Sequence, residues 1–196
     1  MPRTGTHTIR RALASHLGAD DWEQENLFTA KRLPIAELAA KNHGHLSAAE
    51  LRPHVPDEVW DGYFKFAFVR NPFDRFISTC FFLNRKDPGF PAAALPRMKQ
   101  ALRNPGFTQR ILVAPQHRML DNAGGDPAMD FTGHYESLQR DFETVCTRIG
   151  IEPMVLPIEN RSDRGAYADY YDAELEQAVA ALYAGDIERY GYRFSR

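Results

Sequence analysis

The sequence predicts an α/β fold in which a parallel sheet is flanked by helices. An unbroken apolar run at residues 66–69 is typical of a strand that is buried on both faces. Strand-like runs alternate along the chain with segments in which apolar residues recur every three or four positions, as they do on one face of a helix. This alternation is typical of helices packed on a parallel sheet. At 196 residues the chain is long enough for a substantial core, and we expect one domain over residues 1–196.

The first helix is expected over residues 6–17, because its apolar positions have helical spacing and Gly18 is a natural stop. The first N–H groups of a helix have no partner within it and carry the positive end of its dipole. The loop before this helix adds a cation, a glycine and several hydroxyls, which together suit a phosphate or a sulfate. The alternative is an ordinary loop with a polar helix cap. The candidate anion-binding residues are Arg3, Thr4, Gly5, Thr6, His7 and Thr8.

A second candidate anion site follows the buried strand, which is expected over residues 65–70. Asn71 suits the N-cap of a helix and Pro72 its first position, so a helix should begin there directly. Arg70 lies at the carboxyl end of the strand, where open α/β sheets bind ligands. Ser78 lies on the helix face away from the apolar residues. The alternatives are a salt bridge at the sheet edge for Arg70 and an indifferent polar position for Ser78.

The remaining pattern predicts further elements and one long connection. Strands are expected at residues 27–31, 131–135 and 154–158. Helices are expected near residues 34–41, 48–51, 108–112 and 138–149, with a last long helix after Asp172. The proline-containing residues 87–106 are interpreted as a loop.

Composition limits the classes of function. The formal net charge of −2 argues against general nucleic-acid binding. No stretch is long and apolar enough to span a membrane, and no signal peptide is visible. Cys80 and Cys146 are expected to be buried thiols rather than a disulfide, which favours a reducing, cytoplasmic setting.

Both anion segments resemble elements of sulfotransferases. The opening P-R-T-G-T-H-T is similar to their 5′-phosphosulfate loop, usually written P-K-T-G/A-x-T/S. Arg70 and Ser78, eight residues apart within V-R-N-P-F-D-R-F-I-S, resemble the 3′-phosphate-binding element. Other segments are similar to the carbohydrate-type branch, which includes heparan and chondroitin sulfotransferases and many bacterial relatives. These segments are residues 45–51, 114–117, 135–138 and 167–194, in the family's order.

The resemblance implies a P-loop-NTPase-like sulfotransferase fold and a sulfuryl transfer from 3′-phosphoadenosine 5′-phosphosulfate to a hydroxyl, foremost that of a carbohydrate, without a metal. Arg3 would be the cation at the leaving oxygen. His45, in a segment that matches the family's H-x-T/S-A-x-E-L, would be the general base, with His43 and His117 as competitors. The resemblance also implies that Asn160, Ser162 and Tyr167 contact the nucleotide. The alternative is that they belong to a solvated loop.

The chain departs from the family pattern in two places. The family begins with a hydrophobic strand that runs into the 5′ loop, whereas this sequence begins at Met1, immediately before the loop. We therefore expect either a sheet without its first strand or a start further upstream, which leaves membrane or secretory targeting open. Arg3 stands where lysine is usual, and its planar guanidinium donates in a fixed geometry.

Two other functions stay open. A kinase-like phosphotransferase would require Mg²⁺, and the chain lacks a Walker A motif. A truncated or degenerate relative would bind nucleotide or a partner without turnover. The sequence does not identify the acceptor. Residues 87–106 are expected to border the acceptor site, and Arg161 and Arg164 can contact an anionic acceptor.

Overall fold

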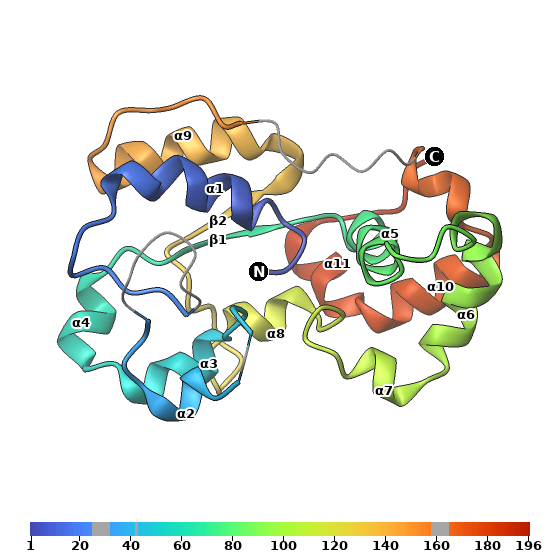
Figure 1. Cartoon of the computed structure of the whole chain (residues 1–196), viewed down its shortest axis with the longest axis horizontal. Helices are drawn as coiled ribbons and strands as arrows, with labels where there is room; N and C mark the ends of the chain where they lie inside the picture. The colour runs from blue at the N-terminus through green and yellow to red at the C-terminus, as the bar shows by residue number, and fades with distance from the viewer. Residues whose placement is uncertain (25–31, 42, 158–164) are drawn as a thin grey trace. The chain divides into compact units, whose positions relative to one another are not determined.

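The computed structural model (Figure 1) describes residues 1–24, 32–41, 43–157 and 165–196. The chain divides into two compact units, each with its own hydrophobic core. Unit 1 comprises Met1–Val69 and Arg118–Glu159, and unit 2 comprises Arg70–His117 and Asn160–Arg196.

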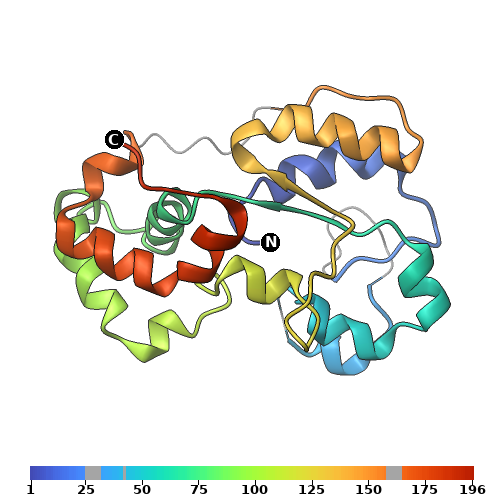
Figure 2. The ribbon, with the colours of Figure 1, turned by 180° about the vertical axis from the view of Figure 1, so that it is seen from behind.

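Unit 1 contains a two-stranded parallel sheet, which confirms the predicted α/β class. Strand β1 (Phe66–Val69) pairs with β2 (Phe131–His134), with Phe66 opposite Phe131. Helices α1 (Thr6–Leu13) and α9 (Leu138–Ile149) lie side by side over these strands (Figures 1 and 2). The core between them consists of Ile9, Phe68, Phe142, Val145, Cys146 and Leu156. Burial of these apolar side chains is the main force that holds α1 and α9 on the sheet.

The rest of unit 1 is built from short helices. They are α2 (Ala36–Ala39), α3 (Ala48–Leu51) and α4 (Asp57–Gly62), with the 3-10 segments η1 (Ala14–His16), η2 (Arg52–His54) and η4 (Tyr135–Ser137). Helix α3 starts with a capping box, in which the hydroxyl of Ser47 accepts the Glu50 N–H and the Glu50 carboxylate accepts the Ser47 N–H. This cap fixes the chain directly after His45.

Unit 2 is helical and centres on α5 (Pro72–Leu83). Asn71 caps this helix, because its side chain accepts the Phe73 N–H at 3.0 Å. Helix α5 packs against α10 (Ala173–Leu182) and the 3-10 segment η5 (Tyr167–Tyr170). The other elements are η3 (Pro91–Ala93), α6 (Ala94–Leu102), α7 (Pro105–Thr108), α11 (Ala184–Tyr190) and α8 (Gln116–Leu120), whose first two residues belong to this unit. Side chains of α5, α6 and α10 form the core, including Phe73, Phe76, Ile77, Met98, Leu175 and Val179.

Most strongly periodic segments fold as predicted. The first helix covers nearly the expected range, with its last turn in the 3-10 form of η1. Helices α3, α5 and α9 match their predicted positions, and α9 ends at Gly150 in the left-handed conformation, with φ of 76°. Cys80 and Cys146 are free and buried, as expected.

Proline explains two wrong predictions. Residues 91–102, within the expected loop, are helical, because Pro91 and Pro96 lie in first turns where no intrahelical N–H bond is needed. The strand expected at residues 154–158 is absent from its described part, 154–157. Pro153 and Pro157 lack the N–H groups of a ladder there, and Val155 is 87% exposed.

Other predicted bounds were also inexact. The helix expected at residues 108–112 lies earlier, as α7, because Asn104 caps it by accepting the Gly106 N–H. The last long helix is divided at Tyr183 into α10 and α11. The strand expected at residues 27–31 lies outside the described residues.

Candidate functional site

The loop before α1 has the backbone geometry of an anion site. Gly5 is the N-cap residue with φ of 82°, and Arg3 also has a positive φ, 63°. No side chain of the described residues caps α1, and its first turn holds no acidic residue. Left-handed residues turn successive N–H groups toward one side of the backbone, as in anion-binding nests. The start of α1 therefore offers N–H groups and a positive dipole end to a phosphate or sulfate.

The loop's side chains are arranged differently from the prediction. The hydroxyls of Thr4 and Thr6 donate to the Met1 carbonyl, at 3.1 and 2.6 Å. Thr4 is 1% exposed and Thr8 is also buried, whereas His7 is exposed. The Thr4 and Thr6 hydroxyls thus stabilise the loop itself, and they would have to turn in order to donate to a ligand.

Gly5 is favoured by its backbone conformation, and a side chain there would also press on a neighbouring leucine. A Cβ at this position would lie 2.8 Å from Cδ2 of Leu138, the first residue of α9. Real Cβ contacts essentially never fall that short, so any side chain here must displace Leu138. The loop is therefore held close to α9, and its shape depends on a glycine.

We expect Gly5→Ala to lower the free energy of unfolding by about 1–2 kcal/mol, because alanine in the left-handed conformation carries a strain of that size. Urea denaturation measures this change. Gly62→Ala is the matched control, since a Cβ there meets no described atom within 4 Å and its backbone needs no positive φ. Equal stability of the two variants would contradict the role given to Gly5.

Arg70 begins unit 2 with its side chain already paired. Its Nε and one terminal nitrogen lie 2.8 and 2.6 Å from Oδ2 of Asp74, one turn into α5. Arg70 is 8% exposed, and Ser78 is 2% exposed. The salt bridge considered as the alternative for Arg70 is therefore present. A phosphate bound at Arg70 would have to share its guanidinium with the Asp74 carboxylate.

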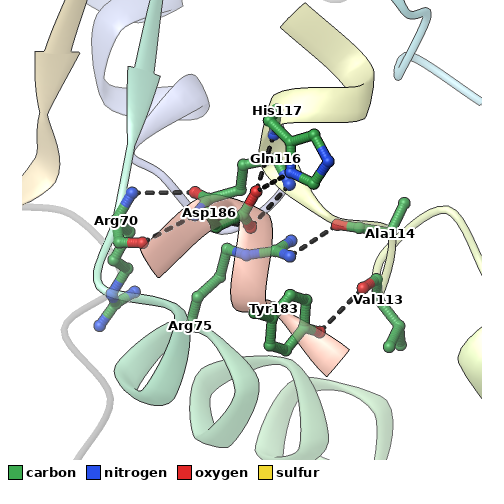
Figure 3. A network of polar contacts seen from close by, with 8 residues as sticks. All are labelled: Arg70, Arg75, Val113, Ala114, Gln116, His117, Tyr183 and Asp186. Carbon is green, nitrogen blue, oxygen red and sulfur yellow. Dashed lines mark hydrogen bonds and ion pairs between the residues drawn. The ribbon is translucent and has the colours of Figure 1, made fainter. Parts of the chain in front are cut away.

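The Arg70 backbone is held by Gln116, which is held in turn by Asp186, and the sequence suggested neither role (Figure 3). The Gln116 side chain accepts the Arg70 N–H at 2.9 Å and donates to its carbonyl at 2.8 Å. Asp186, fully buried in α11, accepts the backbone N–H groups of Gln116 and His117, both at 2.8 Å. Gln116 lies in the P-Q segment that resembles the family, but the resemblance implied no role for its side chain.

A buried arginine supports the same region. Arg75 is 0% exposed and donates to the carbonyl oxygen of Leu112 at 3.4 Å and to that of Ala114 at 2.6 Å. Figure 3 shows the bond to Ala114. Its guanidinium carbon lies 5.1 Å from the ring centre of Tyr183, within cation–π distance. These contacts fix the chain directly before Gln116.

His45, the predicted base, is half-buried in unit 1. Its Nδ1 is buried without a hydrogen-bond partner among the described residues, and its N–H donates to Nδ1 of His43 at 3.4 Å. Burial, with smaller effects of the chain's amino terminus and of nearby groups that include His43 and Arg10, lowers the pKa of His45 to about 4. His45 is therefore neutral at physiological pH and can accept a proton. Nδ1 of His43 already accepts this hydrogen bond, so one of its two ring nitrogens is engaged.

The other histidines have distinct surroundings. Nδ1 of His117 lies 2.7 Å from the Asp186 carboxylate, and a Cβ at Gly185 would overlap the His117 ring. Nδ1 of His134 is 3.8 Å from Asp141 and Nε2 of His54 is 3.9 Å from Glu37, whereas His16 is exposed.

The predicted nucleotide contacts near the C-terminus are mostly outside the described residues, which exclude Asn160 and Ser162. Tyr167 is described in η5. Its hydroxyl bonds to Ser195 Oγ at 2.9 Å, and its ring packs edge-on against Phe194. In this structure Tyr167 therefore joins η5 to the C-terminal segment.

Unit 2 also contains an open pocket of about 530 Å³ between α5, α6 and α7. Its described lining combines apolar side chains with three arginines and three amides, and includes no acidic residue. The lining residues are Cys80, Leu83, Asn84, Phe90, Arg97, Met98, Gln100, Ala101, Arg103, Asn104, Phe107 and Arg110. Arg97 is paired with Asp87 at 2.6 Å and Arg103 with Glu174 at 2.9 Å, outside the lining. The pocket is thus amphipathic and basic.

Metal-binding groups and membrane spans are both absent from the described part of the chain. Within residues 1–24, 32–41, 43–157 and 165–196, no three His, Cys, Asp or Glu side chains gather as a metal-binding group. None of the helices in those ranges has the length and apolar character needed to cross a membrane.

Unit 1 is thus an α/β arrangement, in which a helix that begins at a basic, glycine-containing loop covers a parallel strand pair. The chain belongs to the sulfotransferase family, whose sequence profile matches residues 2–193. It is also similar to an uncharacterized protein of Archaeoglobus fulgidus, with 27% identity over 106 residues, which cover 52% of this chain and 79% of the relative. No solved structure matches the chain.

Proposed function

We propose that this protein transfers a sulfuryl group from 3′-phosphoadenosine 5′-phosphosulfate to a hydroxyl group of an anionic carbohydrate. Family membership supports the transfer of a sulfuryl group. The observation that carries the choice of donor is the uncapped start of α1, with left-handed Arg3 and Gly5. Such a loop suits the 5′-phosphosulfate, and the resemblance of the loop to the family's motif favours the same ligand.

The two anion segments receive different ends of the donor in this proposal. The loop from Arg3 to Thr8 binds the 5′-phosphosulfate through backbone N–H groups, side-chain donors and the Arg3 cation. Arg70 and Ser78 bind the 3′-phosphate, for which Arg70 offers charge-assisted donors. Asn160, Ser162 and Tyr167 are proposed as further nucleotide contacts on the resemblance alone.

The proposed reaction is an in-line displacement. The acceptor oxygen attacks sulfur, the bond from sulfur to the bridging phosphate oxygen breaks, and that oxygen leaves with negative charge. Arg3 stabilises this charge. The acceptor hydroxyl gives its proton to a general base, for which we propose His45, because it is neutral and its segment matches the family's histidine motif.

The basic pocket of unit 2 supports an anionic acceptor. Arg97, Arg103 and Arg110 suit carboxylate or sulfate groups, which guanidinium groups bind in a planar, bidentate manner. Phe107, which is half-buried, adds apolar surface for the body of a sugar ring. The pocket's size is within the usual range for small-molecule sites. It includes residues of the 87–106 segment, which was expected to border the acceptor site.

We expect 3′-phosphoadenosine 5′-phosphate, the desulfated product, to bind at least about tenfold more tightly than AMP, because the 3′-phosphate adds a charge-assisted contact. Isothermal titration calorimetry measures both affinities, and the product should also raise the melting temperature. Tighter binding of AMP, or equal binding of the two nucleotides, would exclude a 3′-phosphate site at Arg70 and Ser78.

A further inference from the structure

A buried carboxylate in unit 2 has hydrogen bonds that the proposed chemistry does not use (Figure 3). Asp186 is 0% exposed and accepts from the backbone N–H groups of Gln116 and His117. It also accepts from Nε2 of Gln116 at 3.4 Å and lies 2.7 Å from Nδ1 of His117. A buried carboxylate needs several donors, since it can only accept hydrogen bonds when ionised. The network supplies them from one short segment at the start of α8.

The Gln116 amide transmits this constraint to Arg70. Its oxygen accepts the Arg70 N–H and its nitrogen donates to the Arg70 carbonyl, so both polar groups of one backbone residue are clamped. Asp186 holds the residue that carries this amide, because it accepts the Gln116 backbone N–H at 2.8 Å, and it supports the orientation of the amide through Nε2 at 3.4 Å. Arg70 directly follows the last residue of β1, so the amide provides there the two bonds that a neighbouring strand would provide.

The clamp acts on the residue proposed to bind the 3′-phosphate. With its backbone fixed at both groups, the Arg70 side chain starts from a defined position and extends toward Asp74. A guanidinium held in place before binding loses less conformational entropy when the ligand arrives. The alternative is that the clamp has no role in binding and only joins the start of α8 to the chain before α5.

We propose that Asp186 is a positioning residue for the phosphate site at Arg70, and that it acts by holding Gln116, whose amide clamps the Arg70 backbone. This inference rests on the proposed function, which supplies the 3′-phosphate. Asp186 itself does not contact the ligand. His117 uses the same carboxylate but takes no part in the clamp, and this separates the two branches of the network.

The test compares the affinities of 3′-phosphoadenosine 5′-phosphate and AMP by calorimetry in four variants. Arg70→Ala is the reference and should weaken binding of the 3′-phosphorylated nucleotide by about 10–150-fold, with little effect on AMP. Asp186→Asn and Gln116→Met should each weaken it by about tenfold, again with little effect on AMP, as expected for residues that orient a binding group. His117→Ala should leave the ratio of the two affinities unchanged. A general loss of structure would lower both affinities together.

Hydrogen exchange of the Arg70 amide provides a readout without a ligand. Its exchange should be slow in the wild type and faster in Gln116→Met, because the amide then loses its acceptor. If Asp186→Asn does not fold, Gln116→Met tests the clamp through which Asp186 acts, and faster exchange of the Arg70 amide with an unchanged ratio of the two nucleotide affinities would overturn the inference.

The outcomes separate the inference from the proposed function. A wild type without preference for the 3′-phosphate overturns both. If Arg70→Ala loses the preference while Asp186→Asn and Gln116→Met retain it, the 3′-phosphate site stands and the positioning role is wrong. An equal loss in His117→Ala would also contradict the role, because it would assign the effect to the network as a whole.

Discussion

His45→Ala should reduce turnover by about 10²–10⁴-fold while leaving the affinity for the nucleotide nearly unchanged. A general base acts on the acceptor proton in the transition state, and its removal costs a factor of this size. Burial lowers the pKa of His45 to about 4, so its ring is neutral at physiological pH, as a base must be before it takes up a proton. Steady-state kinetics and nucleotide titration of the same variant measure both effects.

The pH dependence of kcat/KM provides an independent check on His45. Because burial lowers the pKa of His45 to about 4, the neutral base form should dominate at all pH values well above that. The rate should therefore fall only as the pH drops toward 4, and not near the ordinary histidine value of 6.5. His16→Ala is the control, since His16 is exposed. Normal turnover in His45→Ala together with its loss in His43→Ala or His117→Ala would assign the base elsewhere.

Burial of neutral His45 also predicts the direction of a stability change. Between pH 6.5 and 4 the unfolded chain binds a proton at this position and the folded chain does not. His45 therefore lowers the free energy of unfolding as the pH falls through this range, and the loss is complete below 4. His45→Ala should remove this part of the pH dependence, which urea denaturation at a series of pH values measures.

Arg3→Ala should reduce turnover by about 10²–10³-fold and also weaken binding of the phosphosulfate donor. The first effect follows from the loss of a fixed positive charge at the leaving oxygen, which is worth this much where one stabilising group is removed. The second follows because the same charge contacts the donor in the ground state. Single-turnover kinetics and donor titration separate the two.

Arg3→Lys is the matched variant, because lysine is the usual residue in the resembling loops and keeps the charge. Arg3→Lys should retain most of the turnover. The backbone at this position has φ of 63°, and neither lysine nor alanine relieves this conformation, so the two variants differ in charge. A loss of activity in Arg3→Lys as large as in Arg3→Ala would show that guanidinium geometry, rather than charge, is needed.

The parts of the fold that the sequence could predict are those with strong local signals. Helix α9 was defined by regular apolar spacing and a terminal Gly150, and α5 by Asn71 and Pro72. The helix at α6 was missed because Pro96 is a loop signal by itself and acceptable in a first helical turn. Local patterns do not distinguish these two situations.

The candidate site divides in the same way. The loop before the first helix was indicated by its cation, its glycine and its hydroxyls, whereas the left-handed backbone of Arg3 and Gly5 is seen only in the structure. Asp186 could not be predicted, since a single acid in the first turn of a helix normally interacts with solvent and the helix dipole. Only the fold brings it to Gln116, 70 positions away in sequence. The pairing of Arg70 with Asp74 was visible as i,i+4 spacing, but not whether the two would meet.

The most direct measurement of the central claim is transfer of ³⁵S from labelled 3′-phosphoadenosine 5′-phosphosulfate to a panel of acidic and neutral glycans, with the acceptors separated by electrophoresis. The proposed function predicts label on at least one glycan, with acidic glycans preferred because of the arginines that line the unit 2 pocket. It also predicts that Arg3→Ala abolishes the label. Absence of transfer to every glycan by a protein that binds the nucleotide would contradict the carbohydrate sulfotransferase assignment and favour a nucleotide-binding relative without turnover.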